Sequence, residues 1–328
     1  MLGGGYGEMS AKDVLRLVSK LVSLLVMCAL IVGTINHFYV STSGYRGLDG
    51  YYKMRPNITR GWNVANLGSS HGEYDFDYTG IKGVRGYNLG LNGQYLYYDF
   101  KMLKHFSPKF APGAALIVPV SYFTLGMTYK DERSLNIDAR YNQIFFLTEN
   151  ERSNLLDYIK QRYCPALFSS YLLKYLVIDE SIGGAVRTGS LNPGQMKKSA
   201  IERAAHHQQL MSDGGDATNL KRLKEIISYA KSRGLKPVVV TTPFTTLYIS
   251  QFSAESLARF KEEVTSACRS SKVVYLDYSQ DPRFADSGGL FLDSDHLNVK
   301  GSKVFTGIVI QDLRRRGLIP SSSAGGKS

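Results

Sequence analysis

Short apolar segments alternate with amphipathic segments along most of the chain after residue 61. Five apolar runs bounded by Gly, Pro or polar residues predict strands at 62–67, 83–89, 114–120, 237–242 and 273–276. Apolar residues recur at helical spacing over 94–106, 219–233, 254–267 and 299–313. Strands that alternate with helices predict a parallel sheet with right-handed crossovers and helices on both faces. The expected fold is therefore an α/β domain of three layers, α/β/α.

Residues from about 124 to 215 interrupt this alternation. They contain aromatic-rich helical segments, at 154–163 and 167–177, and polar loops rich in Gly and Ser. We interpret them as a helical insertion or cap, not as a separate core. The domain itself is expected to cover 62–318, and the last residues, 319–328, are expected to form a disordered tail.

The N-terminal part of the chain carries an uncharged apolar run over 21–35. With its apolar flanks it gives about 20 residues within 14–40, the length that spans the core of a bilayer. Three basic residues precede the run: Lys12, Arg16 and Lys20. Basic residues favour the cytoplasmic side, so residues 1–13 are expected in the cytoplasm and the chain beyond Val40 outside.

A cleaved signal peptide and a buried core helix are the alternatives to a membrane anchor. No small-x-small cleavage site cleanly follows the run, and Met27 is too large for the residue before a lipoprotein cysteine. The length of the run argues against a core helix. We therefore predict an uncleaved transmembrane anchor over 14–40, followed by a linker at 41–61 that is rich in Gly and Tyr.

Composition and charge limit the possible functions. Hydrophobic residues make up 43% of the 328, so the chain can bury a sizeable core and global disorder is not expected. A formal net charge of +12 suits an anionic neighbour such as lipid headgroups or a polyanionic polymer. The basic residues are spread along the chain and do not form an aromatic-interleaved patch, so nucleic-acid binding is disfavoured.

The cysteines and histidines do not show metal-ligand spacing. A Cys164–Cys268 bridge and two free thiols both fit the sequence, and we favour free thiols. The adjacent His206 and His207 are interpreted as surface residues, because neighbours on a helix point in different directions. No cofactor or metal is expected.

Polar segments follow the predicted strands where a ligand would bind. The first strand is followed by 66–72, NLGSSHG, the second by 88–93, NLGLNG, and the third by 121–123, SYF. In open α/β sheets, ligands bind beyond the carboxyl ends of the strands. A serine there is a poor nucleophile unless a base removes its proton as it attacks.

A candidate base follows the last predicted strand, in the segment 291–298, FLDSDHLN. An Asp three residues before a His can hold one imidazole nitrogen in a tight turn and leave the other for a hydroxyl. Asp293 and His296 have this spacing, and the carboxylate would fix the tautomer and stabilise the imidazolium. Asp295 stays open as a helix cap or as the acid of the triad.

These blocks resemble the SGNH, or GDSL-type, hydrolase superfamily over most of residues 62–316, the insertion excluded. The likeness is greater to the membrane-anchored branch that includes the D-alanyl-transfer protein of lipoteichoic acid synthesis and partners of membrane-bound O-acyltransferases. Residues 68–70, Gly-Ser-Ser, match the Gly-Asp-Ser block, which implies that Ser70 is the nucleophile. Residues 88–93 match the second block, which implies that Gly93 donates an oxyanion-hole amide beside Asn92. Asp293 and His296 match the Asp-x-x-His block.

The third block of the superfamily, Gly-x-Asn-Asp, is missing, and VPVSYF stands after the third strand. Ser121 is the candidate replacement, unless the amides of Ser70 and Gly93 suffice. Losing one oxyanion donor typically costs about 2.7–4 kcal/mol, which disfavours efficient hydrolysis of simple esters more than transfer in a specialised site. His71 is poorly directed to act as the base, so it is expected to contact substrate or to be a polar turn residue.

The resemblance implies a single-pass membrane protein with an extracytoplasmic serine acyltransferase domain. Ser70 would carry the acyl group, His296 would pass the proton, and Asp293 would orient it. The acceptor would be a cell-surface polysaccharide or teichoic-type polymer, O-acylated or O-acetylated with acyl groups supplied by a membrane-bound O-acyltransferase or a similar multi-pass protein. Two alternatives stay open: a carbohydrate acetyl or acyl esterase, and a catalytically inactive SGNH-like binding or scaffold subunit.

Overall fold

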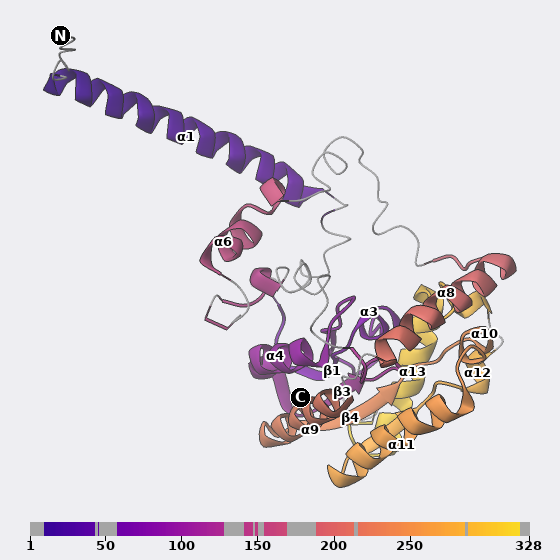
Figure 1. The fold of residues 1–328 in the computed structure, drawn as a ribbon. Coiled ribbons are helices and arrows are strands. Elements are labelled where there is room, and N and C mark those ends of the chain that lie inside the picture. The colour runs from indigo at the N-terminus through magenta and orange to yellow at the C-terminus, as the bar shows by residue number, and fades with distance from the viewer. Residues whose placement is uncertain are drawn as a thin grey trace. The chain divides into compact units, whose positions relative to one another are not determined.

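The structure is a computed structural model, shown in Figure 1. It describes residues 10–42, 45, 58–127, 141–146, 148–149, 154–168, 188–212, 216–285 and 288–321. The chain forms two compact units. One contains Met1–Asp49 and Phe146–Ala185, and the other contains Gly50–Phe145 and Val186–Ser328.

The larger unit is built around a five-stranded sheet in the order β2-β1-β3-β4-β5. Its strands are β1 (Trp62–Asn66), β2 (Gly86–Asn88), β3 (Phe110–Pro119), β4 (Lys236–Thr241) and β5 (Val274–Asp277). Every pairing in this sheet is parallel. The predicted parallel α/β fold is confirmed. β3 begins four residues earlier than expected. The sequence did not predict these first residues as strand, because they are partly exposed and lack the apolar pattern of a buried strand.

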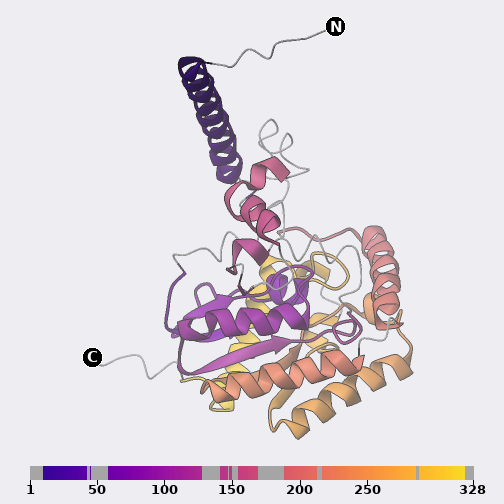
Figure 2. The ribbon, with the colours of Figure 1, turned by 60° about the vertical axis from the view of Figure 1, so that its left-hand side comes forward.

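Helices cover both faces of this sheet. The α-helices of the larger unit are α3 (Ser70–Asp75), α4 (Leu96–Phe106), α8 (Pro193–Ser212), α9 (Asp216–Ser232), α10 (Thr246–Ile249), α11 (Ala254–Ser270), α12 (Pro282–Ala285) and α13 (Val299–Arg315). Short 3-10 turns lie at Ser107–Lys109 (η2), Tyr141–Gln143 (η3) and Gly288–Leu290 (η5). Figures 1 and 2 show α9 and α11 side by side.

Two hydrophobic cores, one on each face, explain the three layers. Leu116 and Val118 of β3 pack with residues of α4, α9 and α11, whereas Ala115 and Ile117 pack with residues of α13. Successive side chains of a strand point to opposite faces, so the continuous apolar run of β3 serves both cores. The second core also includes Ile319, so the packed chain continues one residue beyond the predicted boundary. Residues 322–328 of the predicted tail lie outside the described residues.

The smaller unit is dominated by α1 (Ala11–Ser41), which contains the predicted anchor. At about 1.5 Å per residue its 31 residues extend over about 46 Å. It is long and apolar enough to cross a membrane, by length and composition. Most of the predicted linker at 41–61 lies outside the described residues.

The predicted insertion is divided between the two units. Its middle part, with α6 (Leu155–Tyr163) and η4 (Pro165–Phe168), belongs to the smaller unit, and α8 belongs to the larger one. A small core of Tyr39, Tyr45 and Ala166 joins η4 to the end of α1. The cysteines are free thiols; Cys268 is buried in α11, whereas Cys164 is half-buried.

Candidate active site

The turn after β1 places Ser70 at the carboxyl edge of the sheet. Gly68 has a φ of +109°, a conformation that side chains disfavour, and a Cβ there would lie 3.1 Å from the side chain of Pro119. Ser69 is the N-cap residue of α3, and Ser70 is the first residue of that helix. The sharp turn therefore presents the Ser70 hydroxyl where open α/β sheets bind ligands.

A buried carboxylate holds this turn. Asp99 Oδ1 accepts hydrogen bonds from the Gly68 backbone N–H at 2.7 Å and from Gln94 Nε2 at 2.7 Å. Burial raises the pKa of Asp99 to about 7, although both hydrogen bonds act in the opposite direction. Asp99 lies on α4, so the turn depends on a helix that follows the second sequence block.

Two asparagines hold α3 against the strand ends. Asn66 Nδ2 and Asn88 Nδ2 each donate to the carbonyl of Gly72, both at 2.9 Å. Gly90 lies so close to α3 that a Cβ would approach the Glu73 backbone nitrogen to 2.5 Å. The second block, 88–93, thus positions the helix that carries Ser70.

Three side chains form a hydrogen-bonded chain that starts at Ser70. Ser70 Oγ lies 2.8 Å from His296 Nε2, and His296 Nδ1 lies 2.9 Å from Asp293 Oδ2. With Nδ1–H donating to the carboxylate, Nε2 is free to accept the serine proton. The Leu297 backbone N–H donates to buried Asp75 at 2.9 Å, which fixes the chain beside the histidine. The arrangement is a Ser-His-Asp triad in geometry.

The site is largely shielded from water. Ser70 is 7% exposed and His296 is 4% exposed. Burial disfavours the imidazolium, but the charges of Asp295 and Asp293 outweigh it, so the pKa of His296 is raised above its usual value. A more basic histidine removes the Ser70 proton more readily.

A second buried network lies beside the triad. His71 Nε2 lies 3.2 Å from Asp295 Oδ2, and His71 Nδ1 contacts Ser121 Oγ. Burial lowers the pKa of His71 to about 4, so the ring is neutral, donates to Asp295 and accepts from Ser121. Arg203 also binds Asp295, through Nε to Oδ1 and through Nη2 to Oδ2, the latter at 2.8 Å.

This second network fixes the charge of Asp295. Burial alone would raise the pKa of Asp295, but His296, His71 and Arg203 outweigh it and hold the pKa well below its usual range. Asp295 Oδ1 lies 3.9 Å from His296 Nδ1. The triad histidine therefore faces two carboxylates, Asp293 and Asp295, and the second of them is paired with an arginine.

α8 supplies three polar side chains to this region at a spacing of four residues. Ser199 Oγ lies 3.1 Å from Ser294 Oγ, Arg203 pairs with Asp295, and His207 Nδ1 lies 4.0 Å from Asp295 Oδ2. Residues spaced by four share one helix face. One face of α8 thus packs on the loop that carries the triad histidine.

Several sequence expectations need correction here. His71, expected to contact substrate or to be a polar turn residue, is 0% exposed and bonded on both nitrogens, so the structure places it inside the second network. Asp295 does not cap the last helix; Asn298 does, by accepting from the Gly301 N–H at 2.9 Å. His207 is buried and lies 2.6 Å from the Tyr248 hydroxyl, so the prediction of a surface position was wrong for it.

The predicted oxyanion residues differ in whether their hydrogen-bond donors are already engaged. The Ser121 hydroxyl donates to His71, and its backbone N–H donates to Thr124 Oγ1 at 2.8 Å, so both of its donors are already engaged. The Asn92 backbone N–H donates to Glu73 Oε2 at 2.7 Å. Gly93 lies in the turn after β2, with a φ of +71°, and its role as an oxyanion donor stays a prediction.

Arg203 is the residue of this region that sequence reasoning missed. Its Nη2 lies 3.4 Å from His296 Nε2, next to the atom that would exchange protons. Its side chain is 31% exposed, whereas the carboxylate that it binds is fully buried. The spacing of Ser199, Arg203 and His207 was a signal, but the sequence does not say what that face contacts.

His71, Asp295 and His296 bring three potential metal ligands within 4.8 Å of one another. The donor set does not fit a metal, because each group already has a hydrogen-bond partner and a guanidinium occupies the carboxylate. A cation would have to displace the positive charge of Arg203. The cluster is therefore better described as a hydrogen-bonded network.

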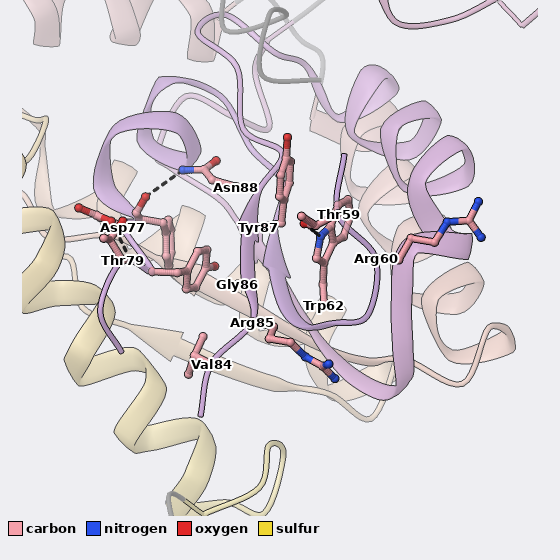
Figure 3. Close-up of a pocket in the computed structure, with 12 residues that line it drawn as sticks. Thr59, Arg60, Trp62, Asp77, Thr79, Val84, Arg85, Gly86, Tyr87 and Asn88 are labelled. Atoms are coloured by element: carbon pink, nitrogen blue, oxygen red, sulfur yellow. Dashed lines mark hydrogen bonds between the residues drawn. The ribbon is translucent and has the colours of Figure 1, made fainter. Parts of the chain in front are cut away.

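A cavity of about 590 Å³ lies elsewhere, beside the edge strand β2 (Figure 3). Its lining includes Trp62 and Tyr87, whose rings stack with centroids 4.3 Å apart. Neither Ser70 nor His296 lines this cavity. The hydrogen-bonded residues Ser70, His296 and Asp293, and not this cavity, define the reactive site.

No family model matches the chain, and no curated protein matches it. Among solved structures, the YxiM protein of Bacillus subtilis aligns over 83% of this chain and 59% of its own, at 13% identity and a TM-score of 0.40. This chain thus spans about three-fifths of that protein. A putative lipolytic protein of the G-D-S-L family from Desulfitobacterium hafniense aligns over 76% of this chain and 97% of its own, at 12% identity and a TM-score of 0.34.

A catalytic mutant of an acetylxylan esterase from Geobacillus stearothermophilus aligns over 79% of this chain and 96% of its own, at 10% identity and a TM-score of 0.34. At identities of 10–13% and TM-scores of 0.34–0.40, these likenesses carry no argument about this chain. The functional argument rests on the geometry of Ser70, His296 and Asp293.

Proposed function

We propose that this chain is a membrane-anchored serine acyltransferase of SGNH type. The observation that carries the proposal is the distance of 2.8 Å between Ser70 Oγ and His296 Nε2, in a hydrogen-bonded series that continues to Asp293. Such a series of hydrogen bonds activates a serine for covalent catalysis. A turn without a catalytic role would not require a buried serine and a buried histidine at hydrogen-bond distance.

The reaction has two halves. Ser70 Oγ attacks the acyl carbonyl carbon while its proton passes to His296 Nε2. The bond to the donor's leaving oxygen or sulfur breaks, and that atom takes the proton, which leaves an acyl-serine. An acceptor hydroxyl then attacks the acyl carbon and gives its proton to His296. Ser70 leaves and regains that proton, so the cycle ends with a transferred acyl group and an unchanged enzyme.

The proposed location is the extracytoplasmic side of the membrane. Three basic residues precede the apolar part of α1, which favours a cytoplasmic N-terminus. The proposed acceptor is a hydroxyl of a cell-surface polysaccharide or teichoic-type polymer, and the proposed acyl donor protein is a multi-pass acyltransferase. Tethering would raise the effective concentration of the domain near such a partner.

Intact-mass measurement after treatment with a fluorophosphonate tests the nucleophile. We expect one covalent adduct on the wild-type chain and none on Ser70→Ala. Ser69→Ala is the matched control, because Ser69 is the adjacent serine and its side chain makes no capping hydrogen bond; it should keep the adduct. His296→Ala should lose or greatly slow labelling. An adduct that persists in Ser70→Ala would contradict the proposal.

A second measurement separates transfer from hydrolysis. The protein is incubated with an aryl ester, with and without a polysaccharide acceptor. Acyl transfer predicts acylated polymer and slow release of free acid. Rapid hydrolysis that ignores the acceptor would instead identify an esterase. A chain without an adduct, whose Ser70→Ala variant leaves polymer acylation in cells unchanged, would be a binding or scaffold subunit.

A further inference from the structure

α6 of the smaller unit exposes a row of large apolar side chains. Leu155, Leu156, Ile159 and Tyr163 are between 44% and 60% exposed. Three of them are spaced by four residues and the fourth is adjacent, so they form one continuous stripe on the helix. An exposed stripe of this kind marks a surface that contacts a partner or a membrane.

The other sides of α6 show that this stripe is not a misplaced core face. Tyr158 is the side chain of α6 that turns inward, and it is buried. Asp157 and Lys160 form a polar side, with an ion pair of 3.9 Å. Asn154 caps the helix by accepting from the Asp157 N–H at 2.8 Å. The helix is thus amphipathic, but its apolar face is exposed and does not pack on the described part of the unit.

α6 and η4 are attached to the far end of α1. Asn36 Nδ2 donates to the Tyr163 carbonyl at 3.1 Å, and its Oδ1 accepts from the Ala166 N–H at 3.2 Å. Asn36 directly follows the uncharged apolar run at 21–35. If α1 spans a bilayer, its polar Asn36 lies where the hydrocarbon core ends, and the α6–η4 segment lies at that same depth.

We propose that α6 lies in the membrane interface, with Leu155, Leu156 and Ile159 in the boundary between headgroups and acyl chains. The proposal rests on the membrane-spanning role of α1. Tyr163 suits the interface because its ring is amphipathic, and Arg162 provides a cation for anionic headgroups. The bilayer is favoured over a protein partner because Asn36, which follows the apolar run of α1, bonds to Tyr163 at the end of α6 and so holds this helix at the end of the span.

The test uses the full-length protein in vesicles of phosphatidylethanolamine and phosphatidylglycerol. Cys28 and Cys164 are replaced by serine. Cys268 stays, because it is 2% exposed and burial raises its pKa to about 12, which makes it unreactive. The variants Leu156→Cys and Ile159→Cys are then labelled with an environment-sensitive fluorophore.

Two further labelled variants serve as controls. Asp157→Cys reports the polar side of the same helix, and Leu24→Cys reports the middle of α1. We expect blue-shifted emission at Leu156→Cys and Ile159→Cys, with quenching by lipids that carry a spin label near the headgroup. Asp157→Cys should stay close to its emission in water, and Leu24→Cys should be quenched by deeper labels.

Three outcomes would overturn the proposal. Water-like emission at Leu156→Cys and Ile159→Cys, with Leu24→Cys embedded, would place α6 outside the interface. Protection in native membranes but not in protein-free vesicles would show that another protein covers the stripe. Water-like emission at Leu24→Cys as well would remove the premise that α1 is inserted. None of these results affects fluorophosphonate labelling of Ser70, so failure here and failure of the proposed chemistry are distinguishable.

Discussion

Replacing Asp295 by Asn tests whether the second carboxylate sets the basicity of His296. Asp295 Oδ1 lies 3.9 Å from His296 Nδ1, and Asp295 is fully buried. Its negative charge stabilises the imidazolium, so Asp295→Asn disfavours the protonated form. The pKa of His296 should therefore fall, and the free base should persist to lower pH.

The size of the shift follows from the distances. Two unit charges 3.9 Å apart interact by about 4 kcal/mol at an effective dielectric constant of about 20. One pKa unit corresponds to about 1.4 kcal/mol, so the upper limit is about three units. Arg203 Nη2 lies 3.4 Å from His296 Nε2 and lowers the pKa of His296 in the wild type already, so it adds nothing to the shift. Because Arg203 is partly exposed, water reaches this side of the network and screens the interaction, and we expect the pKa of His296 to fall by about one to two units.

The assay is the pH dependence of kcat/KM for an aryl ester, which reports ionisation in the free enzyme. The acid limb should move to lower pH by about one to two units, and the plateau should fall because a weaker base takes the serine proton less readily. Asp277→Asn is the control, since that carboxylate pairs with Lys261 away from the triad. Asp295→Asn combined with Arg203→Gln should move the limb back towards the wild type.

Two results would refute this reasoning. An acid limb that stays in place in a folded Asp295→Asn variant would show that the charge of Asp295 does not reach His296. A limb that moves to higher pH would show that the sign is wrong. Circular dichroism on each variant separates these results from a loss of structure.

Three further predictions follow from the same contacts. Asp293→Asn should lower kcat by roughly 10⁴, because it removes the group that fixes the His296 tautomer; single-turnover acylation measures this. Burial raises the pKa of Asp99 to about 7, so its contribution to stability is present at low pH and is lost as pH rises through that value. Asp99→Asn should therefore flatten part of the fall in unfolding free energy between about pH 4 and pH 7 in urea titrations. Gly90→Ala should destabilise the fold by about 1–3 kcal/mol, because its Cβ would lie 2.5 Å from the Glu73 nitrogen.

The sheet was accessible from the sequence because its signals are local. Continuous apolar runs such as 114–120 mark strands buried on both faces, and the glycine at 234 ends a helix in the left-handed conformation, with a φ of +72°. The carboxyl ends of parallel strands share one edge. Segments that follow different strands, such as those of Ser70 and His296, therefore meet although 226 positions separate them.

The second network was not accessible from the sequence, because it depends on contacts between distant elements. Arg203 pairs with Asp295 across 92 positions, and His71 reaches the same carboxylate across 224. A polar residue on a helix has the same local pattern whether it faces solvent or a buried charge. The insertion was equally ambiguous, since helical spacing at 154–163 does not tell which unit the helix joins.

The loop from Asp293 to His296 shows why spacing alone does not assign roles to two carboxylates. Both lie within three residues of the histidine, and both are close to its Nδ1, at 2.9 Å and 3.9 Å. Their surroundings separate them. Among the described residues, Asp293 is partly exposed and bonds within its own loop, whereas Asp295 is buried and bonds to His71 and Arg203. A buried carboxylate without a cation would neutralise itself by taking a proton. His296, His71 and Arg203 together keep Asp295 ionised, and since Arg203 comes from α8, the charge of this carboxylate depends in part on a residue of the insertion.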